Sequence, residues 1–234
     1  MRMLLVAVLA ALAGVAQAQA PGRYVTERGW GNLVVKPGKG GAMAFEINAI
    51  GGNMHICNLD GEIRGGRATL EGIDDRKPCI VTFKPGPQGV DVATVTEDAC
   101  RQYCGARAHF TGMYLRPAKG CAGNEVEATR AAFKRHYDAK RYADARALLE
   151  PVLDGCAKTL GWIDEAWIRN DVAITQYRLG DRAACVKTLD PLAGDAGKTD
   201  AQLKDDYPPS DYDMYRRVVG ATRANLKLCK SPAK

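Results

Sequence analysis

Eight cysteines constrain this 234-residue chain more than any other feature, because their number is even and they divide equally along the sequence. Four precede Pro117 and four follow it. They are Cys57, Cys79, Cys100 and Cys104 in the first group, and Cys121, Cys156, Cys185 and Cys229 in the second. In an oxidising compartment such cysteines pair as disulfides. We therefore expect two domains with two disulfides each.

The start of the chain predicts that oxidising compartment. Arg2 supplies a positive charge, residues 4–15 form an apolar run, and the small residues around Ala18 and Ala20 suit a signal peptidase. The run is shorter than the roughly 20 residues that span a bilayer, and no later stretch is long and apolar enough. We expect residues 1–20 to be a signal peptide, cleaved near Ala18 or Ala20, and the protein to be periplasmic in a Gram-negative cell, or secreted.

The charge pattern argues against a nucleic-acid partner. The formal net charge is +6 at pH 7, but basic residues alternate with acidic ones instead of gathering in one stretch, as they do in nucleic-acid-binding proteins. We therefore expect a protein or peptide partner in the cell envelope, no nucleic acid and no membrane span. The composition leaves the oligomeric state open.

Residues 21–117 have the pattern of a small antiparallel β domain. Apolar and more polar residues alternate through 42–50, which is the period of a strand with one buried face. Gly- and Pro-rich turns separate this run from other short ones. The strands expected are 32–36, 42–50, 54–59, 67–72, 79–83, 90–95 and 108–115. Closely spaced strands joined by short turns suggest a small barrel or sandwich.

Residues 118–234 change to helical spacing, rich in alanine, leucine and charged residues. The helices expected are 125–140, 141–158, 163–180, 181–196 and 210–229. The chain therefore belongs to the α+β class, with a β domain followed by an all-α domain. Glu150-Pro151 recurs as Asp190-Pro191, forty residues later, which indicates an internal repeat.

The repeat carries a resemblance to a known family. The segment 171–192, DVAITQYRLGDRAACVKTLDPL, resembles a tetratricopeptide repeat, with Gly180-Asp181 at the turn between its two helices. The alternative is an ordinary all-α bundle. In antiparallel helix pairs the start of one helix lies beside the end of the next, so we expect the disulfides Cys121–Cys156 and Cys185–Cys229.

The tetratricopeptide resemblance implies a binding groove lined by the first helix of each pair. By position, its residues would be Arg130, Lys134, Tyr137, Trp167, Asn170, Ile174, Tyr177 and Arg178. Aromatic residues and arginine are the usual anchors of protein interfaces. A basic, aromatic groove would prefer an acidic or extended peptide. The alternative for the aromatic residues is packing between helices.

The stretch CRQYCGARAHF at 100–110 allows more than one chemistry. Cys100, Cys104 and His109 could bind zinc with Cys57 or Cys79, whereas a redox pair would need Cys-x-x-Cys beside a βαβ pattern. In an exported protein, disulfides are the expected outcome. Each of Cys100 and Cys104 would then reach back to Cys57 or Cys79, with the pairing left open. We expect no metal and no cofactor.

The same stretch, with the upstream His55-x-Cys57, resembles a small cysteine-rich domain of exported, loosely lysozyme-inhibitor-like bacterial proteins. The resemblance implies a second hypothesis. An inhibitor or immunity protein would block a cell-wall enzyme with exposed basic loops of the β domain. Lys39, Arg76 and Lys77 are the tips of those loops.

Motifs for catalysis are missing from the sequence. There is no Gly-x-Ser-x-Gly and no Gly-rich loop that leads from a strand to a helix with a phosphate-binding lysine. We therefore expect no enzyme, and an enzyme of unknown class is only the third hypothesis. The first is a non-catalytic scaffold or adaptor that binds through the helical half, and the inhibitor is the second.

Overall fold

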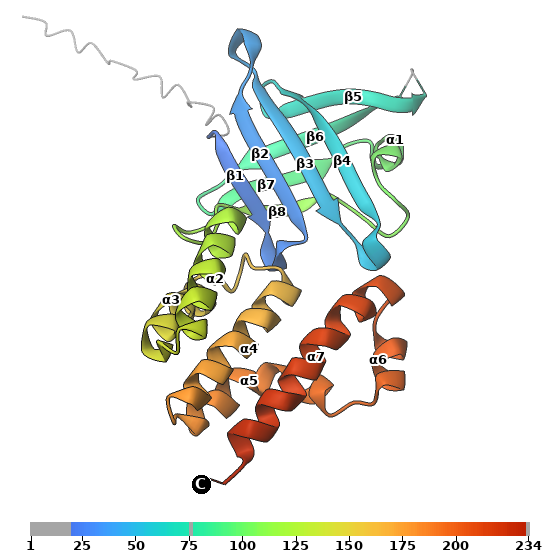
Figure 1. Cartoon of the computed structure of the whole chain (residues 1–234). Helices are drawn as coiled ribbons and strands as arrows, with labels where there is room; N and C mark the ends of the chain where they lie inside the picture. Colours follow the sequence, from blue (N-terminus) through green and yellow to red (C-terminus); the bar gives the residue numbers. More distant parts are fainter. Residues whose placement is uncertain (1–19, 75–76, 233–234) are drawn as a thin grey trace, which may run out of the picture.

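The computed structural model describes residues 20–74 and 77–232, in which a β barrel precedes a set of helices (Figure 1). The α+β class expected from the sequence is confirmed. The strands are β1 (Gly22–Thr26), β2 (Gly31–Pro37), β3 (Met43–Ile50), β4 (Ile56–Ile63), β5 (Arg67–Asp74), β6 (Lys77–Pro85), β7 (Gly89–Thr94) and β8 (Gly112–Leu115).

The strands form one antiparallel sheet in the order β4-β3-β2-β1-β8-β7-β6-β5, so pairing of β1 with β8 nearly closes a barrel. The alternation in 42–50 is confirmed. Phe45, Ile47 and Ala49 are buried inside, while Glu46 and Asn48 face outward. The interior is filled by apolar side chains from all eight strands together with Phe110, so it is a packed core.

Three strands differ most from the expectation. β4 runs from Ile56 to Ile63 rather than over 54–59, because residues 60–63 continue the ladder with β3. β1 was not predicted, because this five-residue segment gains its stability from pairing with β2 and β8 rather than from its own pattern. The last strand begins at Gly112 and not at Ala108. The Tyr114 hydroxyl donates to the Phe110 carbonyl at 2.8 Å, and His109 stacks on Trp30, which holds the residues before Gly112 as a loop.

A short helical segment covers the gap between β4 and β5. It consists of α1 (Glu97–Cys100) and η4 (Arg101–Tyr103). On the β5 side, the Gln102 amide and the Tyr103 hydroxyl donate to the Glu71 carbonyl at 2.7 and 3.0 Å. On the β4 side, the Gly105 N–H donates to the Ile56 carbonyl at 2.8 Å. The segment thus satisfies backbone groups that a β4–β5 pair would have used.

Two disulfides fix this segment across the gap. Cys57 of β4 pairs with Cys104, with 4.0 Å between Cα atoms, and Cys79 of β6 pairs with Cys100, with 4.6 Å. The pairing that the sequence left open is therefore resolved. It also removes the thiolates that a zinc site at Cys100 and Cys104 would need.

The helical half is built from hairpins. The helices are α2 (Gly123–Asp138), α3 (Tyr142–Cys156), α4 (Trp162–Arg178), α5 (Arg182–Ala196), α6 (Asp200–Asp206) and α7 (Pro209–Lys230). α2 packs on α3 and α4 on α5, while α7 lies against both α4 and α5 (Figure 1). Among the helices of the described residues, none has the length and apolar character needed to cross a bilayer.

The two disulfides expected here are present. The Cα atoms are 5.3 Å apart in Cys121–Cys156 and 5.9 Å apart in Cys185–Cys229. The forty-residue offset also has a structural counterpart, since Leu149 and Leu189 are both fully buried on the second helix of their hairpins. Helix α6 was not predicted. Thr199 and Gln202 begin it with a reciprocal capping box.

The barrel and the helices meet at two contacts. In the turn η1 (Glu27–Gly29), the Arg28 N–H donates to the Lys158 carbonyl at 2.8 Å. In η3 (Gly52–Met54), the Asn53 side-chain oxygen accepts from the Ser210 hydroxyl at 3.1 Å and from its N–H at 3.4 Å. Ser210 is the first residue of α7 that has an N–H to donate, because prolines precede it. A barrel side chain therefore caps this helix.

We predict that the disulfides across the gap stabilise the barrel. The double variant Cys79→Ala/Cys100→Ala should lose about 2–4 kcal/mol of unfolding free energy, because the cross-link restricts the unfolded chain. Urea unfolding of the full chain measures this, with intrinsic fluorescence as the signal. An unfolding free energy equal to that of the native chain would show that the hydrogen bonds alone hold the segment.

Candidate functional site

A groove of about 580 Å³ lies between α2 and α4, and we call it the α2–α4 groove. Residues at positions 130, 133, 134 and 137 of α2 face it, which is the i, i+3, i+4, i+7 spacing of one helix face. The opposite wall comes from α4. The side chains that line it are Glu127, Arg130, Ala131, Phe133, Lys134, Tyr137, Asp138, Asp171 and Ile174.

One end of the groove is aromatic. The ring of Tyr137 lies 5.7 Å from that of Phe133 and 5.3 Å from that of Tyr142, measured between centroids. Arg178 at the end of α4 forms a hydrogen bond with the Tyr137 side chain, which raises the pKa of Arg178. These contacts fix the half-buried Tyr137 ring in one orientation, so the apolar wall is preformed.

Ion pairs neutralise the basic residues of the groove. Arg130 spans two carboxylates of α4, with 3.5 Å to an Asp164 oxygen and 3.6 Å to an Asp171 oxygen. The Lys134 ammonium lies 2.6 Å from an Asp138 oxygen. Burial raises the pKa of Asp171, while the charge and hydrogen bond of Arg130 oppose that rise. The lining therefore has no excess of positive charge, with Arg130 and Lys134 against Glu127, Asp138 and Asp171, and the preference for an acidic peptide expected from a basic groove does not follow.

Three of the residues expected in the groove lie elsewhere. Asn170 is only 2% exposed, and its amide donates to the Thr222 hydroxyl of α7 at 2.9 Å. Trp167 packs in the cluster formed by α4, α6 and α7, and Tyr177 packs beside Cys185 in the one formed by α4, α5 and α7. Because α7 covers this face of α4, the side chains there are committed to helix packing.

Comparisons of the chain with protein-family models, curated proteins and solved structures found no match. The groove itself therefore carries the functional inference. Five of its lining residues were missed by the sequence reasoning, namely Glu127, Ala131, Phe133, Asp138 and Asp171. Phe133 could have been found, because it has the helical spacing of Arg130 and Tyr137 and so lies on the same face of the helix. The sequence gives no sign of Asp171, because its partner Arg130 is distant along the chain.

The basic loop residues of the inhibitor hypothesis are not brought together. Lys39 is exposed at the tip of the β2–β3 hairpin, and Lys77 is exposed at the start of β6. These tips lie far apart in Figure 1, both away from the helices. Arg76 lies outside the described residues.

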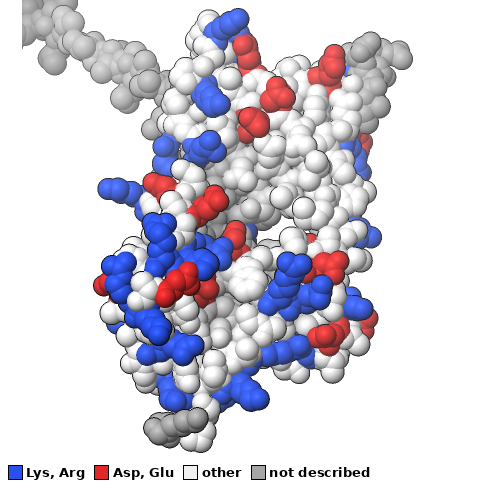
Figure 2. Space-filling model, in the orientation of Figure 1, with Lys and Arg blue, Asp and Glu red and all other residues white. Residues whose placement is uncertain are grey.

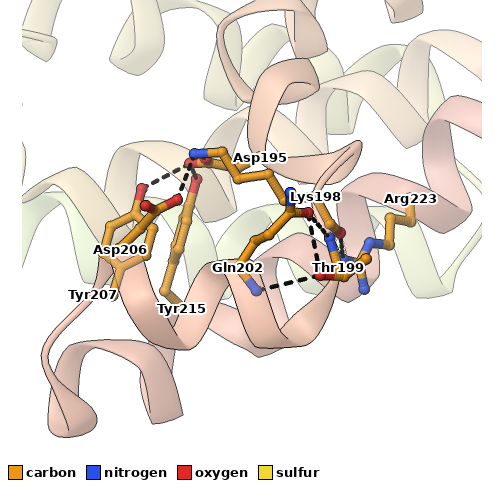
Figure 3. A network of polar contacts seen from close by, with 8 residues as sticks. All are labelled: Asp195, Lys198, Thr199, Gln202, Asp206, Tyr207, Tyr215 and Arg223. Atoms are coloured by element: carbon orange, nitrogen blue, oxygen red, sulfur yellow. Dashed lines mark hydrogen bonds and ion pairs between the residues drawn. The ribbon is translucent and has the colours of Figure 1, made fainter.

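A second cluster of titratable side chains lies where α5, α6 and α7 meet (Figure 3). The Asp195 carboxylate accepts hydrogen bonds from the hydroxyls of Tyr207 at 2.7 Å and Tyr215 at 2.9 Å, and from the Lys198 ammonium at 2.6 Å. Lys198 also pairs with Asp206 at 2.9 Å. The tyrosine rings pack around Trp162 of α4.

The pKa values of this cluster indicate a structural role. Burial on its own would raise the pKa of Asp195, but the hydrogen bonds from Lys198, Tyr207 and Tyr215 bring it below its ordinary value. Burial, followed by the bond to Asp195, raises the pKa of Tyr207 to about 12. Both tyrosines therefore stay protonated as donors and the carboxylate stays ionised. Such a set joins three helices and has no group poised to exchange a proton near neutral pH.

We predict that the Asp195 network stabilises the fold in a pH-dependent way. Because the folded-state pKa is lowered, the stabilisation is present above the ordinary aspartate pKa of about 3.9 and is lost as pH falls through the lowered value. Asp195→Asn should therefore unfold in less urea than the native chain at neutral pH, and the difference should shrink in acid. Asp205→Asn, an exposed change on α6, is the control and should show no such trend. A difference that stays constant with pH would contradict the prediction.

We also predict that Arg130 sets the ionisation of Asp171. Arg130→Ala removes the charge and the hydrogen bond that lower the pKa of Asp171, so that pKa should rise further above its ordinary value. Carbon-detected NMR titration of the aspartate side chains measures it. Lys134→Ala, which removes the neighbouring basic residue of the same groove, should leave the Asp171 titration unchanged.

Proposed function

We propose that this is a non-catalytic envelope protein that binds another protein through the α2–α4 groove, as a scaffold or adaptor. The observation that carries the proposal is the groove's composition. Tyr137 and Ile174, both half-buried, form a partly exposed apolar surface next to the buried Phe133 ring, and Arg130 and Lys134 beside them are paired with aspartates. A surface that is partly apolar, preformed and without an excess of positive charge suits a protein segment.

The physical basis of binding would be burial of these apolar side chains. Each square ångström of apolar surface removed from water is worth roughly 25 cal/mol, less the cost of ordering the partner. The contacts of Tyr137 with Phe133, Tyr142 and Arg178 reduce that cost on this side, because the ring is already held. Selectivity would come from the shape of the aromatic end rather than from net charge.

The tetratricopeptide relationship is part of the same proposal. Two helix hairpins follow each other with α7 beside the second, and the buried residues Ala145 and Cys185 occupy matching positions in the two hairpins. The periplasmic location is proposed too. It is supported by the four disulfides, which form in oxidising compartments. Residues 1–19, which make up nearly all of the expected signal peptide, lie outside the described residues.

Variants that place a negative charge in the groove test the binding role. The mature chain, immobilised, should capture an envelope protein from periplasmic extract. Lys134→Glu, inside the groove, and Ile174→Asp, on its opposite wall, should each weaken that capture at least about tenfold. Lys187→Glu, the same reversal at an exposed position of α5, should not. Circular dichroism melting checks that each variant is folded, and equal capture by all of them would refute the proposal.

The inhibitor remains the alternative, supported by the β-barrel domain and the exposed lysine of the β2–β3 hairpin. Lysozyme activity measured with the full chain separates the two. Inhibition that Lys39→Glu relieves and Lys134→Glu leaves intact would favour the alternative. Absence of inhibition, with capture that depends on Lys134, would favour the adaptor.

A further inference from the structure

The α2–α4 groove does not end at Arg130. A second hollow, of about 480 Å³, shares Glu127 and Arg130 with it, and its far wall belongs to the barrel. Val25 of β1 and Asn32 of β2 form that wall. These two residues are direct partners in the β1–β2 ladder, so they lie side by side on the outer face of the sheet. The groove thus passes from the helices onto the barrel.

The hollow continues across the outer face of the barrel. A third depression, of about 680 Å³, shares Val25 and Asn32 with the second and extends to Val34 and Asn48. A fourth, of about 400 Å³, shares Val34 and Asn48 with the third and reaches Asn58 of β4. Four adjoining depressions with common lining residues therefore form one series from α4 to β4, which we call the channel, and the Arg130 side chain crosses it where it pairs with Asp164 and Asp171. We call the part over β1–β4 the barrel half.

The floor of the barrel half is a row of amides. Asn32 is opposite Asn48, and Asn48 is opposite Asn58, so the three side chains stand in one register on neighbouring strands. Adjacent strands are about 4.8 Å apart. All three are exposed, and the Asn48 amide nitrogen donates to a Glu46 carboxylate oxygen at 2.8 Å, which leaves the Asn48 carbonyl oxygen and the amides of Asn32 and Asn58 for a ligand. An amide both donates and accepts, which matches peptide groups and uncharged polar side chains of a bound chain.

An apolar pair borders the amide row. Ile50 and Ile56 are the next cross-strand partners along β3 and β4, and each is 50% exposed. These two half-exposed isoleucines face each other across the two strands and enlarge the apolar surface that a partner would cover. Figure 2 shows the barrel surface above the helices as a broad area almost free of charged side chains, hollowed where the barrel meets the helices.

The junction between the two halves is rigid. The Gly29 backbone lies against the Gly161 backbone so closely that a Cβ at position 29 would stand 2.7 Å from the Gly161 nitrogen. The Arg28 hydrogen bond to Lys158 and the Ser210 bonds to Asn53 hold the same relation. The channel is therefore preformed across the junction, and a ligand that spans it pays no cost to align the two parts.

The charged residues along the channel indicate the net charge of the ligand that would bind there. Arg130 and Lys134 are paired with aspartates, and over the barrel Arg23 and Lys36 lie among Glu46 and Asp60. Each of the four depressions is lined by charges of both signs, so a strongly acidic or strongly basic partner would meet like charge in every one of them. Neutral hydrogen-bonding groups interspersed with apolar ones fit an extended, uncharged polypeptide segment.

We propose that one extended segment of the partner protein occupies both the α2–α4 groove and the barrel half. This inference rests on the proposed function and adds the partner's conformation, its lack of charge and a second binding wall. The barrel and the helices then bind the same segment. The amide row forms hydrogen bonds with the part of the segment that extends beyond Arg130.

A peptide selected on the full mature chain tests the proposal. The probe is the tightest linear sequence from a phage-displayed random peptide library, measured by fluorescence anisotropy. Asn48→Arg and Asn58→Arg, two exposed changes in the barrel half, should each weaken its binding about tenfold, and so should Ile174→Asp in the groove. Thr69→Arg, an exposed change on β5 of the same barrel, should have no effect. Thermal melting confirms that each variant folds.

The outcomes separate the two proposals. Loss of binding in both halves supports a single segment along the channel. If only Ile174→Asp weakens binding, the groove function stands and the extension onto the barrel is overturned. If only the asparagine variants weaken binding, the α2–α4 groove is not the site, and both proposals fail. Selection of strongly acidic or basic peptides, or displacement of the probe by a soluble polysaccharide, would overturn the neutral polypeptide as occupant.

Discussion

An open eight-stranded sheet has two edges whose backbone groups need partners, and this constraint shapes the first half of the molecule. The pairing of β1 with β8 brings the two edges, β4 and β5, to face each other, and the segment that holds α1 and η4 fills the space between them. The disulfides Cys57–Cys104 and Cys79–Cys100 attach that segment to both sides of the gap. The barrel is consequently completed by covalent bonds where hydrogen bonding between strands stops.

The closed barrel leaves its outer face available, and the helices determine how that face is used. The helix hairpins stand below β1 and β2, so that their grooved side continues the outer surface of the sheet (Figure 1). Arg130 lies at the crossing point and is held by Asp164 and Asp171 on α4. The ion pairs that hold α2 against α4 also neutralise Arg130, so the same contacts pack the helices and remove a positive charge from the channel.

Much of the fold could be predicted because its signals are local. The alternation in 42–50 and the helical spacing of α2 depend on neighbouring residues, and two disulfides followed from the geometry of antiparallel helices. β1 was missed because five residues are too few to display a period of two, although most of its ladder is with β2, the next strand in sequence, and only its pairing with β8 is distant.

The candidate site was predictable only in part, for a related reason. Arg130, Lys134 and Tyr137 share a helix face that the sequence displays. The packing of α7 on α4, which buries Asn170, and the pairing of Arg130 with Asp171 depend on which helices become neighbours. Spacing along one helix contains no information about that choice.

The contact between Gly29 and Gly161 shows that the angle between the barrel and the helices depends on the absence of a side chain at position 29. Arg28 and Gly29 both adopt positive φ values, 64° and 69°, to bring the turn against the helix start. Even a methyl group at position 29 would act as a wedge, because it would meet backbone that has no rotamer to change. A designer who wished to widen or tilt the channel would therefore begin at Gly29, which itself lines the hollow between the barrel and the helices.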